Sequence, residues 1–142
     1  MQLTSRPSVD STLLHIAYAM AQRGTCPYIQ VGAIVARDGR ILTSGYNGAP
    51  AGMEHCTHGD RDPDLPITPC LTAIHAEANA VAFAARFGVS LNEATMYTTL
   101  SPCRTCAQLI IQSGITRVVC MEMYRDPSGV ELLRAASIAV SL

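Results

Sequence analysis

Apolar residues along the chain follow two different periods, whose alternation predicts nine elements of secondary structure. Four segments have apolar residues every three or four positions, which predicts helices over 8–23, 74–87, 102–113 and 130–136. Five short runs predict strands over 31–37, 41–46, 95–99, 117–121 and 138–140. A helix and two strands are thus followed by three helix–strand pairs. We expect the whole chain, residues 1–142, to form one domain.

The connections between these elements predict an α/β fold with a mixed sheet. Asp38-Gly39 separates the first two strands and is a typical hairpin turn, so these strands should pair antiparallel at one edge. The later strands alternate with helices, which favours parallel pairing with helices covering the sheet faces.

Residues 48–69 form a long segment without hydrophobic period, rich in Gly, Pro, Asp and His. A loop of this length inside a compact domain is usually functional. It contains Cys56 and reaches Cys70, so a bound metal could order it.

Charge and composition argue against several classes of protein. The formal net charge is -1, which gives no basic field for nucleic acid. No apolar run approaches the roughly 18 residues of a membrane span, and the polar segment 1–10 lacks the features of a signal peptide. We therefore expect a soluble cytoplasmic protein. Disulfides are disfavoured in that compartment, so the six cysteines point to metal binding or redox chemistry.

Two predicted helix starts carry the residues of a catalytic zinc centre. His75 and Glu77 open one helix, and Pro102 is expected in the first turn of another, followed by Cys103 and Cys106. The two cysteines are three positions apart and should share a helical face. Two thiolates and one imidazole leave the fourth zinc position for water. The helix dipoles would stabilise the thiolates.

Glu77 is the predicted proton carrier of this centre. A carboxylate beside an activated water can take its proton and deliver it to the substrate. His75 and Glu77 are not at a same-face helical spacing, so they must converge in a distorted first turn. Each motif alone has a plainer explanation, such as helix capping, a redox pair or half of a structural zinc site. Together they predict a zinc-dependent hydrolytic deaminase of aminopyrimidines or aminopurines.

Longer motifs resemble the deoxycytidylate deaminases over about residues 13–140. They are Gly45-Tyr46-Asn47-Gly48-Ala49-Pro50-Ala51-Gly52, His75-Ala76-Glu77-Ala78-Asn79-Ala80, Thr99-Leu100-Ser101-Pro102-Cys103-Arg104-Thr105-Cys106-Ala107 and Ile110-Ile111-Gln112-Ser113-Gly114-Ile115. The resemblance implies the three-layer α/β/α cytidine-deaminase fold with a central mixed five-stranded sheet. It implies conversion of dCMP and water to dUMP and ammonia, which supplies thymidylate synthesis. It also implies a homohexamer activated by dCTP and inhibited by dTTP, with Mg²⁺ on the nucleotide.

The resemblance further implies substrate contacts. Asn47 matches the residue that holds the sugar 3′-hydroxyl, and Tyr124 falls where a tyrosine lies near the substrate. Ala76 and Ser101 are expected to bind substrate too. For Ser101 the reason is local: Pro102 fixes the turn beside it, so its backbone carbonyl is a candidate acceptor for the amine. Arg86 lies where some viral members have an arginine tied to nucleotide response.

One position departs from the family pattern. Many bacterial members have a phosphate-contacting arginine two residues after the cysteine that matches Cys26, and here that residue is Tyr28. Tyr28 is therefore a candidate nucleotide-contacting or allosteric position, and strand packing is the plainer alternative. Activity on dCTP or on 5-substituted dCMP stays open.

Three further cysteines match a second, structural zinc of the family. Cys26 and Cys56 have the matching positions, and Cys70 stands five residues before His75. His58 is preferred to His55 as the fourth ligand, which would close the site tetrahedrally. Three free thiols are the alternative.

Other functions would need other features. A tRNA adenosine deaminase should have a basic face, and the chain has no lysine among its ten basic residues. A deaminase of free cytidine usually has a different ligand pattern. A non-catalytic zinc module would leave Glu77 and the open zinc position unexplained.

Overall fold

The computed structural model describes residues 5–58 and 70–142. Segment 59–69 of the predicted long loop and the first four residues of the polar N-terminus lie outside the described residues. The observed elements follow the predicted order and are α1 (Val9–Ala21), β1 (Gly32–Arg37), β2 (Arg40–Tyr46), α2 (Ala76–Phe87), β3 (Thr95–Leu100), α3 (Arg104–Gln112), β4 (Arg117–Glu122), α4 (Ser128–Ala135) and β5 (Ala139–Ser141).

The five strands form one mixed sheet in the order β2-β1-β3-β4-β5, which confirms the predicted α/β class. β1 is antiparallel to β2 and to β3, whereas β3, β4 and β5 are parallel. The hairpin turn lies where it was predicted, and Asp38 and Gly39 have φ values of 53° and 72°. Two consecutive residues with positive φ are typical of a type I′ turn, which suits a two-residue hairpin.

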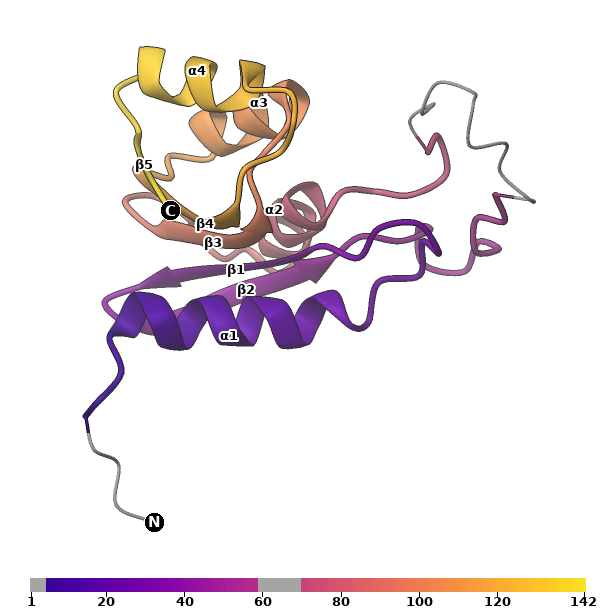
Figure 1. Cartoon of the computed structure of the whole chain (residues 1–142), viewed down its shortest axis with the longest axis horizontal. Coiled ribbons are helices and arrows are strands. Elements are labelled where there is room, and N and C mark those ends of the chain that lie inside the picture. The colour runs from indigo at the N-terminus through magenta and orange to yellow at the C-terminus, as the bar shows by residue number, and fades with distance from the viewer. Residues whose placement is uncertain (1–4, 59–69) are drawn as a thin grey trace.

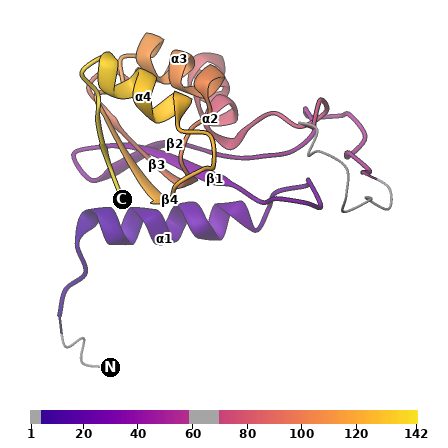
Figure 2. The same cartoon turned by 45° about the horizontal axis from the view of Figure 1, so that its top comes forward.

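The helices cover both faces of the sheet and make three layers (Figures 1 and 2). α1 packs on one face against Ile34 and Tyr97, and α2, α3 and α4 cover the other face, where Val35 and Met96 are buried. Neighbouring residues of a strand thus enter opposite cores, as the period of two in a strand requires. None of the helices among the described residues is long and apolar enough to cross a membrane.

The predicted ends of two helices were wrong in a way that matters for the site. α2 begins at Ala76 rather than 74, and α3 begins at Arg104 rather than 102. Pro102 therefore lies before the first turn of α3 instead of within it. His75 and Cys103 are the capping residues, and their extended backbone interrupts the helical period.

A polar cluster joins the start of α1 to β4 on the far side of the sheet from α2. The Asp10 carboxylate accepts hydrogen bonds from Arg117 Nη1 and from the Tyr97 hydroxyl, both at 2.9 Å. The bond to Arg117 lowers the pKa of Asp10 from its ordinary value of 3.8. Both charged side chains remain more than one-third exposed, so solvent screens the pair.

Asp10→Asn is expected to lower the free energy of unfolding at neutral pH by about 0.5–1 kcal/mol. Because the folded-state pKa of Asp10 is lowered, its contribution is fully present above the unfolded pKa and is lost as pH falls through the folded value. Urea unfolding of both proteins from about pH 7 to about pH 3 measures this. The two free energies should converge toward the acid end, and a constant difference would contradict the assignment.

Candidate active site

The catalytic candidates lie at the starts of two helices, α2 and α3, which approach each other in the structure. His75 directly precedes α2 with φ -69° and ψ 152°, and Cys103 directly precedes α3 with φ -70° and ψ 171°. Cys103 therefore does not share a helical face with Cys106, as the sequence spacing had suggested. Instead the two occupy the cap and the third helical position, which are neighbours at a helix start. His75 and Glu77 are only two positions apart, a spacing that would place them on different faces of a regular helix. They can belong to one site because the backbone of His75 is extended rather than helical.

The three candidate ligands converge in the structure. His75 Nδ1 lies 3.4 Å from Cys103 Sγ and 3.5 Å from Cys106 Sγ. The donor atoms all lie within 4.8 Å of one another. Tetrahedral zinc with ordinary Zn–S and Zn–N bonds places a sulfur and a nitrogen about 3.5 Å apart. The residues present therefore fit zinc, with one coordination position left over.

Burial differs sharply across this cluster. Cys106 and Glu77 are 2% and 4% exposed, while His75 is exposed and Cys103 is partly exposed. One side of the site is therefore buried and carries the Glu77 carboxyl group. The other side is exposed to solvent, so a small molecule can approach it.

The surroundings shift the acidity of the site residues. Hydrogen bonds with Cys106 and His75 lower the pKa of Cys103 to about 3, which favours the thiolate that a metal requires. Burial raises the pKa of Glu77 to about 6. A carboxyl group with a pKa near neutrality can both accept and release a proton under physiological conditions.

Two glycines set the positions of the ligand-bearing helices. A Cβ atom on Gly45 in β2 would lie 2.2 Å from the Ala76 carbonyl oxygen, and one on Gly129 in α4 would lie 2.0 Å from the Pro102 carbonyl oxygen. The backbone next to His75 and next to Cys103 therefore packs directly on a glycine. No sequence motif indicates this role for either residue; a glycine inside a predicted strand was the available signal for Gly45.

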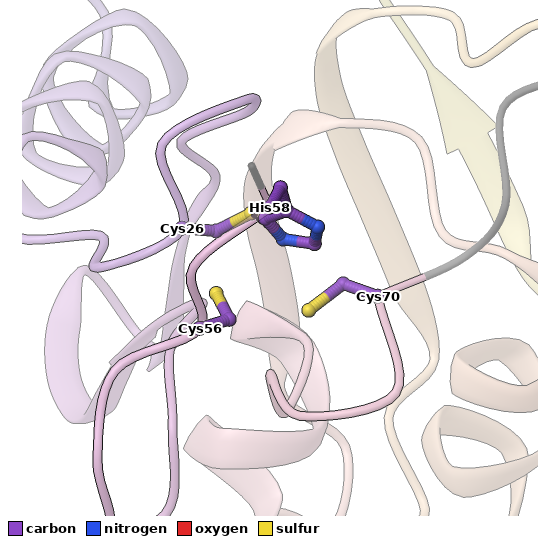
Figure 3. A group of neighbouring side chains, drawn as sticks. All are labelled: Cys26, Cys56, His58 and Cys70. Carbon is purple, nitrogen blue, oxygen red and sulfur yellow. Dashed lines mark hydrogen bonds between the residues drawn. The ribbon is translucent and has the colours of Figure 1, made fainter. Parts of the chain in front are cut away.

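The second predicted metal cluster also comes together. The donor atoms of Cys26, Cys56, His58 and Cys70 all lie within 4.8 Å of one another, and Figure 3 shows the four side chains converging. His58 Nε2 lies 3.4 Å from Cys26 Sγ. His55 is exposed and is not part of this cluster. Four Cys and His donors, two of them buried, fit a closed tetrahedral zinc site.

Asn47 is buried, and its side chain holds a neighbouring loop. Its Oδ1 accepts from Val31 N, and its Nδ2 donates to the Ile29 carbonyl, each at 2.7 Å. Asn79, which the sequence analysis did not single out, donates to the Tyr46 carbonyl at 2.9 Å. Contact of Asn47 with a sugar hydroxyl stays a prediction.

The remaining predicted substrate or nucleotide residues include three near the candidate site, Ser101, Tyr124 and Ala76, and one far from it, Arg86. Ser101 Oγ accepts a hydrogen bond from the backbone N–H of Tyr124 at 2.7 Å. Because Ser101 lies two positions before Cys103, this bond holds Tyr124 close to the candidate site. Ala76 is fully buried at the start of α2. Arg86 lies at the other end of α2, about 16 Å along the helix from His75, with its guanidinium 5.5 Å from the Phe87 ring.

Comparison with known proteins places this arrangement in one family. A model of the cytidine and deoxycytidylate deaminase zinc-binding region matches residues 7–122. The chain belongs to the cytidine and deoxycytidylate deaminase family, which confirms the resemblance seen in the sequence.

Several relatives carry a more particular name. The deoxycytidylate deaminase of Enterobacteria phage T4 is 37% identical over 168 residues, covering 92% of this chain and 87% of that protein. The deoxycytidylate deaminase of Mycobacterium phage D29 is 44% identical over 125 residues, covering 81% and 95%. The crystal structure of dCMP deaminase from cyanophage S-TIM5 in complex with dCMP and dUMP has a TM-score of 0.83 at 29% identity, covering 97% of this chain and 99% of that one.

Proposed function

We propose that this protein catalyses the hydrolytic deamination of dCMP to dUMP and ammonia. The observation that carries the proposal is the convergence of the exposed His75, the partly exposed Cys103 and the buried Cys106 beside the buried Glu77. Relatives named deoxycytidylate deaminase, together with a neighbouring structure described with dCMP and dUMP, support this substrate.

In the proposed reaction the ligand residues bind the metal and Glu77 transfers protons. A zinc ion held by His75, Cys103 and Cys106 would supply Lewis acidity that lowers the pKa of water. Glu77 takes the proton from the water as its oxygen adds to C4 of the cytosine ring, and it delivers that proton to ring nitrogen N3. Glu77 then transfers the proton of the hydroxyl group now on C4 to the 4-amino group. The C4–N bond breaks, and ammonia leaves dUMP behind. The buried surroundings of Glu77 keep this transfer away from bulk water.

Other residues would orient the nucleotide. The Ser101 carbonyl would accept from the amine, Asn47 would hold the sugar, and Tyr124 would border the substrate. Ala76 would contribute backbone contacts beside His75. With Tyr28 in place of a phosphate-contacting arginine, dCTP and 5-substituted dCMP remain alternative substrates of the same chemistry.

The wider role follows from the same resemblance. The second cluster would hold a structural zinc ion through Cys26, Cys56, His58 and Cys70. The product would supply thymidylate synthesis in the cytoplasm, with regulation by dCTP and dTTP, Mg²⁺ accompanying the nucleotide, Arg86 taking part in the response, and a homohexameric assembly. We propose no nucleic-acid partner, because the chain has a net charge of -1 and lacks lysine.

A substrate panel tests the proposed activity. We expect kcat/KM for dCMP to exceed that for CMP, deoxycytidine, dCTP and 5-methyl-dCMP by at least about tenfold, because the missing or added groups leave polar partners unpaired or crowd the site. Ammonia release with zinc-loaded protein is the measurement, with and without dCTP or dTTP. A preference for dCTP or 5-methyl-dCMP would favour the alternative substrates. Inactivity toward all five compounds would reject the proposed function.

A further inference from the structure

Tyr28 contacts the second metal cluster. Its hydroxyl donates to the His58 backbone carbonyl at 2.7 Å, and its ring centroid lies 4.5 Å from that of the His58 imidazole. Two separate contacts thus fix both the backbone and the ring of one residue. The imidazole held in this way presents Nε2 at 3.4 Å from Cys26 Sγ.

The segment that carries Tyr28 is itself held on both sides. Before it, the Thr25 N–H donates to the Asn47 carbonyl at 3.0 Å. After it, the Asn47 side chain binds the Ile29 carbonyl and the Val31 N–H. Because Asn47 directly follows β2, Tyr28 projects from a part of the chain that is tied to the sheet. It can therefore position His58, which belongs to a segment outside any helix or strand.

We infer that Tyr28 is a positioning residue for the second metal cluster, orienting His58 so that Nε2 faces the three thiols. The inference rests on the metal site proposed above and assigns a role to the residue that replaces the phosphate-contacting arginine of other family members. It also gives a physical reason why His58 joins the cluster and His55 does not. Metal-binding histidines generally depend on such outer contacts, whose loss weakens metal binding about 10–100-fold.

Zinc release from the purified full chain tests this role. Wild-type protein should contain two zinc ions per chain, and release to a colorimetric chelator should show a phase that disappears in Cys70→Ser. Tyr28→Phe removes the hydroxyl but keeps the ring, and we expect it to speed that phase at least about tenfold. The other phase should not change. Tyr18→Phe, a similarly exposed tyrosine on α1, is the matched control and should release zinc like the wild type.

A second pair of variants separates positioning from general loop packing. If Tyr28 acts through His58, Tyr28→Phe should have no further effect on zinc release in a His58→Ala background. Additive effects in that background would overturn the inference. So would wild-type release in Tyr28→Phe, or a raised KM for dCMP with unchanged release, which would make Tyr28 a substrate contact. A wild-type zinc content near one per chain would instead reject the second metal site, and the role of Tyr28 with it, without touching the proposed deaminase activity.

Discussion

Glu77→Gln is expected to lower kcat for dCMP deamination by about 10³-fold or more while leaving the zinc content of the protein unchanged. Glutamine has nearly the shape of glutamate but cannot accept either of the two protons that the reaction must transfer. His75, Cys103 and Cys106 stay in place, so metal binding should survive. Steady-state ammonia release and zinc analysis of the same preparation measure the two quantities.

The stability of this variant provides an independent check. Burial raises the pKa of Glu77 to about 6, which means that the folded protein holds the carboxylate at a cost. Replacing it with a neutral amide should therefore not lower Tm. Glu131→Gln, which changes an exposed carboxylate on α4 in the same way, should leave both activity and Tm near wild type. Activity within tenfold of wild type in Glu77→Gln would remove the residue from the proposed mechanism.

The order of elements was predictable because it depends on hydrophobic period alone. Val35 and Ile34 alternate between two cores, and Asp38-Gly39 makes the turn that such a pattern requires. The helix starts were not predictable to the residue. His75 and Cys103 are capping residues with extended backbone, and a hydrophobic period does not report whether the residue before a helix is extended or helical.

The sequence indicated which residues belong to the candidate site, but not how they are arranged in space. Ligand spacing nominated His75, Cys103 and Cys106, and the family resemblance nominated the other four, Cys26, Cys56, His58 and Cys70. The structure gathers these seven residues into two groups. The contacts that support the two groups from other segments were not predictable from the sequence. Tyr28 and His58 are 30 residues apart, and nothing in either motif indicates that the phenol would bind the other residue's carbonyl. The close approach of Gly129 to Pro102 is equally invisible, because a glycine in a helix has several explanations.

A short segment of the chain connects the two candidate metal sites. Cys70 belongs to one cluster and His75 to the other, and between them Ile74 exchanges two backbone hydrogen bonds with Gly48, at 2.8 and 3.1 Å. Gly48 directly follows Asn47, which ties the Tyr28 segment to the sheet. The second candidate cluster therefore lies at the far end of the short segment that ends at His75. A metal bound there would restrict the position of His75.

The packing of α2 on β2 allows an equally sharp test. Gly45→Ala is expected to lower the free energy of unfolding by about 3 kcal/mol and Tm by about 10 °C. The added methyl would lie 2.2 Å from the Ala76 carbonyl oxygen and 2.6 Å from the Ala80 nitrogen. Both are backbone atoms, so no side chain can rotate away and the helix itself must move. Thermal and urea unfolding measure the loss.

The same substitution should also lower kcat, because the helix start that it displaces carries His75 and Glu77. A misplacement of about 1 Å at a catalytic centre can cost about 10²-fold in rate, so we expect kcat to fall by that order at a temperature where the variant is folded. Gly88→Ala is the matched control at the other end of α2. Gly88 has φ 67° and open space around its Cα, so alanine there adds backbone strain of about 1 kcal/mol without displacing the helix. Its kcat should stay at the wild-type value, and equal losses of activity in both variants would show that stability, rather than the position of α2, limits the rate.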